Sequence, residues 1–153
     1  MLEIKTEKVI EGIGFYKPTE IKSILDSKID EEGLPFLNAI LSKPVSSISS
    51  EIGFGIHVID TKGGGLDPFG VNDVVFAPAY HLICLIAHLV EKGDRALLAD
   101  WLGHSNPLIS VPTFDHSRIS IGSMILGNGK IPIRGMWVEK RISGFFRPVA
   151  LIE

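Results

Sequence analysis

The chain has only one cysteine, Cys84, so an internal disulfide framework is excluded and folding needs no oxidising compartment. It has no internal repeat, and its first residues lack the basic start and apolar centre of a signal peptide. We therefore expect a protein of the cytoplasm, or of a particle assembled in the cytoplasm.

The chain also has little net charge. A net charge of −3 gives no reason to expect a nucleic-acid partner. The charges are unevenly spread, because residues 1–100 hold 9 Lys/Arg and 15 Asp/Glu while residues 101–153 hold 6 and 3. An acidic part and a basic part favour head-to-tail association. The alternative is a solvated sheet face with scattered cations.

Apolar residues are plentiful in comparison. The 153 residues are 45% hydrophobic, and their mean hydropathy is +0.29. This length predicts one domain over residues 1–153 with a core of its own. The high hydropathy favours a chain that also covers apolar surface in a homo-oligomer or a larger assembly.

The first third of the chain predicts one strand and two short helices. Residues 2–10 are strand-like, and Lys17-Pro18 marks a helix start with Thr19 as its cap. Helical spacing of apolar residues follows, and Leu34–Leu41 predicts the second short helix.

The centre of the chain predicts a pair of helices. Val74–Val90 is a run of 17 residues without Asp, Glu, Lys or Arg, which indicates a buried helix to about Glu91. An amphipathic helix should follow and end at Gly103. We do not expect the apolar run to have a membrane role, because it is short and contains Pro78 and two histidines.

Strand patterns surround this helical region. Glu51–Asp60 alternates in hydrophobicity, and Ser117–Leu126 and Lys130–Ile142 flank the turn Gly127-Asn128-Gly129. Pro132 cannot donate to a strand ladder, so its strand should have a free edge or a bulge. With Phe145–Ile152 as a final strand or arm, the sequence predicts an α+β fold with a C-terminal antiparallel β-meander.

The predicted apolar helix contains side chains that could bind a metal ion or take part in catalysis. His81, Cys84 and His88 have the spacing i, i+3, i+7, which places them on one helical stripe. Imidazole and thiolate are zinc ligands, but residues seven apart lie roughly 10 Å apart along a helix, so further ligands would have to come from elsewhere. The alternative is a core helix with a buried thiol and two hydrogen-bonded histidines.

The remaining polar clusters are His57 with Asp60, His104 with Ser105, and Asp115-His116-Ser117. They could supply Ser/His/Asp chemistry, but the chain has no GxSxG elbow. We assign no catalytic residue, metal ligand or cofactor. If the protein is an enzyme or binds metal, its candidate residues are His57, Asp60, His81, Cys84, His88, His104, Asp115 and His116.

Leu102-Gly103-His104-Ser105 resembles the box of tyrosine recombinases that ends in LGHS, and the resemblance implies a catalytic role for His104. It covers about twenty residues. The arginine expected a short way upstream is absent, and both tyrosines, Tyr16 and Tyr80, precede the box. We therefore interpret these residues as a helix end, capped at Gly103 and stopped by Pro107.

Two regions predict contacts with other chains. The Gly-rich segment Thr61–Asn72 is long for a loop in a compact domain, and such loops are often functional. The C-terminal strands mix aromatic and basic residues. The candidate interface comprises Lys62, Gly63, Gly64, Gly65, Phe69, Trp137, Phe145, Phe146 and Arg147.

These observations favour a non-enzymatic structural or assembly subunit that forms oligomers, such as a virion, tail or secretion-apparatus component. It would act through protein–protein contacts and bind no nucleic acid. One alternative is a small metal-binding protein or hydrolase that uses the His, Asp and Cys residues above. Another is a partner-binding inhibitor of the immunity type.

Overall fold

The computed structural model describes residues 3–42, 51–60, 77–93, 108–109, 117–121, 130–137 and 145–152. The element order is β1 (Glu3–Gly14), α1 (Pro18–Leu25), the 3-10 turn η1 (Glu31–Gly33), α2 (Leu34–Ser42), β2 (Glu51–Asp60), α3 (Ala79–Lys92), β3 (Leu108–Ile109), β4 (Ser117–Ile121), β5 (Ile133–Trp137) and β6 (Phe145–Ile152). Helices and strands are therefore mixed, as an α+β fold requires.

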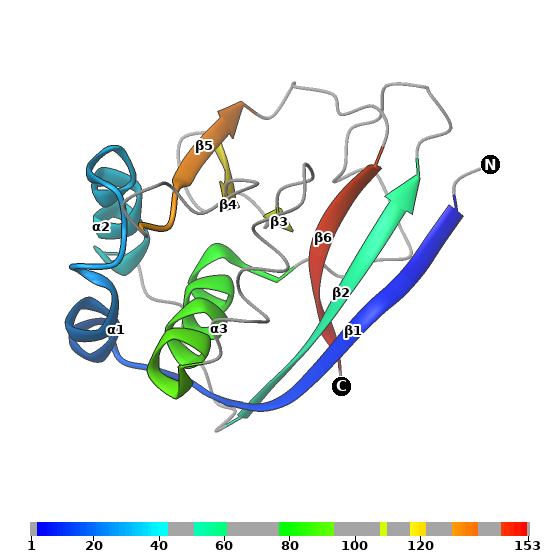
Figure 1. Cartoon of the computed structure of the whole chain (residues 1–153), viewed down its shortest axis with the longest axis horizontal. Coiled ribbons are helices and arrows are strands. Elements are labelled where there is room, and N and C mark those ends of the chain that lie inside the picture. The colour runs from blue at the N-terminus through cyan, green and yellow to red at the C-terminus, as the bar shows by residue number, and fades with distance from the viewer. Residues whose placement is uncertain are drawn as a thin grey trace.

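The strands form one sheet in the order β1-β2-β6-β3-β4-β5 (Figure 1). Of the strands predicted for the meander, β4 and β5 are antiparallel neighbours, and β3 pairs antiparallel with β4. β6 does not extend them, because it pairs antiparallel with β2 and parallel with β3. Its Val149 and Ala150 are buried, which favours an interior place in the sheet.

The two edge strands differ in length and in how they are protected. β5 begins directly after Pro132 and lies at one edge of the sheet, in agreement with the prediction from this proline. β1 lies at the other edge and is longer than predicted, because two register shifts interrupt its alternation. The second shift, between Ile10 and Ile13, contains Gly12 at φ +73°, a conformation that favours glycine.

The short helices begin and end where their sequences change. α1 starts at Pro18, and the N-cap is Lys17 rather than the predicted Thr19. The Lys17 backbone N–H donates to Glu20 Oε1 over 2.9 Å, so a carboxylate three residues on satisfies the free donor. Ile21 and Leu25 are buried one turn apart on this helix.

The predicted buried helix is α3. It begins at Ala79, because Pro78 is extended (φ −59°, ψ 154°), and it ends at Gly93 in the left-handed conformation (φ +71°). Every residue from Leu82 to Ala87 is buried, so the helix is surrounded on all sides. It contacts β1, α1 and α2 and lies between the strands and the α1–α2 pair (Figure 1). The predicted second helix, near residues 94–103, lies outside the described residues.

A small group of backbone hydrogen bonds joins the turn after α1 to the residues before β5. Asp30 N–H donates to the Ile131 carbonyl over 3.1 Å, and Ile131 N–H donates to the Lys28 carbonyl over 2.8 Å. Gly33 packs closely beside them, because a Cβ there would lie 2.6 Å from Asp30 Oδ1 and 3.2 Å from Ile133 Cβ. These bonds tie the two short helices to the far edge of the sheet.

Candidate functional site

The histidine and cysteine stripe lies on α3, but its members differ in exposure. Cys84 is fully buried, whereas His81 and His88 are half-buried. Burial raises the pKa of the Cys84 thiol to about 11, so this thiol is protonated near neutral pH and is a poor nucleophile or ligand. Within the described part of the chain, no three His, Cys, Asp or Glu side chains are grouped to hold a metal ion.

His81 faces the corner that follows β1. Its ring meets the ring of Phe15 edge-on, with 5.6 Å between the centroids. Its Nδ1 is buried and has no hydrogen-bond partner among the residues that the structure describes. Burial lowers the pKa of His81 below 6.5, so the imidazole is neutral at pH 7.

An aromatic cluster around His81 holds that corner to α3, and the sequence patterns did not predict it. The rings of Phe15 and Tyr80 stack with 5.2 Å between centroids. Tyr80 Oη donates to the Tyr16 carbonyl over 2.8 Å, and Tyr16 Oη donates to Glu91 Oε1 over 3.0 Å. Burial, first of all, raises the pKa of Tyr16 and of Tyr80 to about 12. These neutral phenols act as anchors rather than as acids or bases.

His57 lies apart from this cluster, on β2. Its Nδ1 is 3.0 Å from Oγ1 of Thr6, the residue opposite it on β1. Its ring also passes over Gly55, where a Cβ would lie 3.2 Å from His57 Cε1. Burial lowers the pKa of His57. Asp60 ends the same strand opposite Glu3, and only its backbone is described.

The structure does not place the side chains of the other predicted site residues relative to His57 or to the stripe on α3. His104, Asp115, His116, Lys62, Gly63, Gly64, Gly65 and Phe69 lie outside the described residues. Trp137, Phe145, Phe146 and Arg147 are described by their backbone alone. Phe146 pairs with Ile59 of β2, and Arg147 pairs with Leu108 of β3, so this part of β6 is bonded within its own chain.

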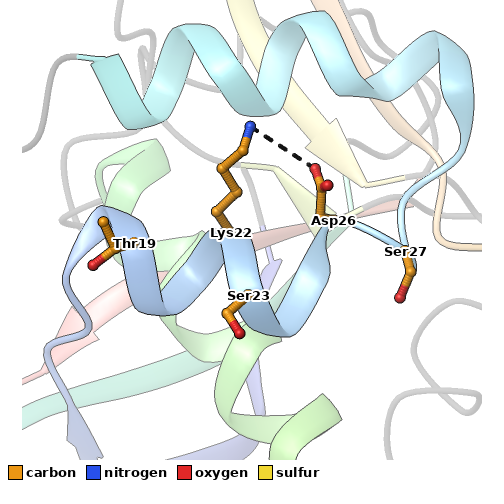
Figure 2. Close-up of a pocket in the computed structure, with 5 residues that line it drawn as sticks. All are labelled: Thr19, Lys22, Ser23, Asp26 and Ser27. Atoms are coloured by element: carbon orange, nitrogen blue, oxygen red, sulfur yellow. Dashed lines mark ion pairs between the residues drawn. The ribbon is translucent and has the colours of Figure 1, made fainter.

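Two shallow hollows lie along α1. The larger, about 450 Å³, is lined by polar side chains (Figure 2), namely Thr19, Lys22, Ser23, Asp26 and Ser27. Lys22 Nζ is 3.9 Å from Asp26 Oδ1 and donates to Asn38 Oδ1 over 3.4 Å. The smaller hollow, about 360 Å³, shares Thr19 and Ser23 and adds Glu20, Ile24 and Glu91. Ligand pockets are usually clefts that enclose most of their ligand, whereas both hollows are wide open to solvent, so they lack that character.

Exposed side chains follow one another along the first half of β1. Every side chain from Ile4 to Val9 is exposed, with exposed fractions of 37% for Ile4 and 50% for Val9. These two are the large exposed hydrophobic side chains of the described chain. One side of the strand pairs with β2, and no described strand pairs with the other side. We call residues Ile4–Val9 the β1 edge.

The comparisons with known proteins leave this chain without a family. No protein-family model, curated protein or solved structure matches it. None of its described helices is long and apolar enough to cross a membrane, and the longest, α3, has 14 residues. The site must therefore be judged from its own geometry.

Proposed function

We propose that this chain is a non-enzymatic subunit of a protein assembly and that it acts through contacts made by the β1 edge. This proposal is supported by the position of β1, a 12-residue strand that lies at one edge of the described sheet and pairs there with β2 alone. An unpaired strand side presents a row of backbone donors and acceptors to any strand that approaches it.

The exposed side chains support the same proposal. Ile4 lies opposite Ile59 on β2 and Val9 lies opposite Gly55, so both share the sheet face of His57, away from buried Phe54 and Ile56. A strand added beside β1 would cover part of both apolar side chains. β6, in contrast, uses its side facing β2 within the chain, which directs the proposal to β1 rather than to a C-terminal arm.

The kind of assembly stays a prediction from the sequence. A virion, a tail and a secretion apparatus are all built from subunits that join by such contacts. The high apolar content of the chain agrees with a subunit of this type.

Light scattering with size-exclusion chromatography tests the proposal. The wild-type protein should exceed the monomer mass of 16.7 kDa. The double variant Ile4→Thr with Val9→Thr keeps β-branched residues and removes the apolar contact, so it should shift toward the monomer. The matched control, Lys28→Thr with Lys92→Thr, changes two exposed residues away from β1 and should leave the mass unchanged. A wild-type protein that stays monomeric at about 100 µM, where weak interfaces are still populated, contradicts the proposal.

A further inference from the structure

Tyr16 is bound to α3 at three separate points. It lies in the connection between β1 and α1, residues 15–17, which we call the corner. Its backbone donates a hydrogen bond to the Cys84 sulfur, and its carbonyl accepts one from Tyr80 Oη over 2.8 Å. Its own Oη donates to Glu91 Oε1 over 3.0 Å. The attachment of the corner to α3 therefore depends largely on the contacts of one residue.

His81 lies beside this attachment with one ring nitrogen out of reach of water. Its Nδ1 is buried and has no hydrogen-bond partner in the part of the chain that the structure describes. Its ring meets the ring of Phe15, in the corner, with 5.6 Å between centroids. A protonated imidazole carries an N–H donor at both nitrogens, so it would leave a donor and part of its charge without a partner here. The closed corner therefore favours the neutral ring.

We propose that the corner is a pH-sensitive latch, which is closed on α3 while His81 is neutral and opens when His81 takes up a proton from solvent. The ring is half-buried, so a small rotation brings Nδ1 to water. That rotation removes the ring contact with Phe15, the residue before Tyr16, and the contacts of Tyr16 with α3 should then open more often. Every group in the latch belongs to one chain, so this inference does not depend on the proposed assembly.

The other charged groups near the corner do not supply the partner that a protonated His81 needs. Titratable groups act on the corner from α1, from α3 and from the corner itself, namely Glu20, Tyr80, Cys84, Glu91 and Tyr16. Burial alone lowers the pKa of His81, so none of these groups offsets it. The remaining charge of the corner, on exposed Lys17, is positive and would oppose a second positive charge. Acid therefore acts against the closed corner at His81.

Hydrogen exchange of single backbone amides, followed by NMR and corrected for the intrinsic exchange rate, tests the latch. An imidazole released to solvent has the ordinary pKa of 6.5, so one unit below it the charged form exceeds the neutral form about tenfold. The corner should be fully closed above that pKa. Opening at the Tyr16 amide should increase several-fold between about pH 7.5 and about pH 5.5, toward a limit of about tenfold.

An amide outside the corner separates local opening from global unfolding. The Ile29 N–H donates to the Leu25 carbonyl over 3.1 Å, in the turn after α1. Its protection should change less with pH than that of the Tyr16 amide. An equal change at both amides would indicate global unfolding and overturns the latch.

Histidine variants identify the group that takes up the proton. His81→Gln removes the titrating ring, so the protection of the Tyr16 amide should no longer change with pH. His88→Gln is the matched control, because His88 is also half-buried on α3, and it should keep the wild-type response. If His81→Gln does not fold, His81→Phe keeps a ring beside Phe15 and binds no proton. A response that survives the loss of His81, or that disappears in His88→Gln, overturns the inference.

The Glu91 carboxylate is the other group through which acid could act on Tyr16. Glu91→Gln keeps an acceptor for Tyr16 Oη but no longer titrates. The latch predicts the wild-type pH response of the Tyr16 amide in this variant. A response lost in Glu91→Gln would assign the acid sensitivity to Glu91 and overturn the inference for His81.

Discussion

The two halves of β1 have opposite surroundings although they belong to one strand. Ile4, in the first half, is 37% exposed, whereas Ile13, in the second half, is 1% exposed. The second half lies beside α3, which contacts β1, and leads into the aromatic corner at Phe15 and Tyr16. One strand thus contributes to the core at one end and, at the other, has a side with which no described strand pairs.

Matched isoleucine truncations should give the largest difference between these halves. Ile13→Ala removes a buried side chain and should lower the free energy of unfolding by about 2–5 kcal/mol. Ile4→Ala should change the stability of the monomer by less than about 0.5 kcal/mol, because its side chain is already exposed. Urea unfolding monitored by circular dichroism, at a concentration that keeps the protein monomeric, gives both values. Similar costs for the two variants would mean that the halves are not distinct.

Two glycines at the buried end of β1 differ in backbone conformation, so alanine substitutions there should have different costs. Gly12 has φ +73°, so Gly12→Ala should cost about 1–2 kcal/mol of stability. Gly14 has open space where a methyl group would lie, with no heavy atom within 4 Å, and its φ is not left-handed. Gly12 also has no heavy atom within 4 Å of an added Cβ, so the two variants differ in backbone strain and not in crowding. Gly14→Ala should therefore be tolerated, and thermal unfolding of the two variants measures the strain at Gly12. A tolerated Gly12→Ala would contradict the bulge geometry.

The two histidines next to β1 give the smallest predicted effect, a change in pH dependence. Burial lowers the pKa of both His81 and His57 below 6.5, so the unfolded chain binds protons that the folded chain does not. Stability should then be full above about pH 6.5 and fall as the pH drops through that value toward the folded pKa. His81→Gln should flatten the dependence of unfolding free energy on pH between about pH 7 and pH 5, and His57→Gln should flatten it further.

The result for His81→Gln can contradict this view. The two histidines lie on separate elements, α3 and β2, so their contributions should add. An unchanged slope in His81→Gln would mean that the buried Nδ1 costs nothing on protonation.

Much of the secondary structure follows from the local sequence. Glu51–Asp60 is a strand with the predicted bounds, because its alternation is uninterrupted. Phe145–Ile152, predicted as a strand or arm from its apolar residues, is also a strand. The prediction for β1 ends at residue 10 because bulges break the period of two that identifies a strand. The place of β6 between β2 and β3 was not predictable, since strand pairing is a non-local choice.

The candidate site was harder to predict than the fold. Helical spacing alone placed His81 and Cys84 together, but it said nothing of the aromatic rings that surround them. The Phe15–Tyr80 stack joins residues far apart in sequence, so no local pattern predicts it. The exposure of Val9 depends on which strands lie beside β1, and the local sequence does not determine that.

The position of β6 has a consequence for the order of folding. β6 follows every other described strand in the chain, yet it links the β1–β2 pair to β3, β4 and β5. During synthesis on a ribosome, the two parts of the sheet would emerge first and wait without the strand that joins them. The nascent chain would then expose unpaired strand edges until β6 arrives, which makes early contact with a chaperone valuable for this protein.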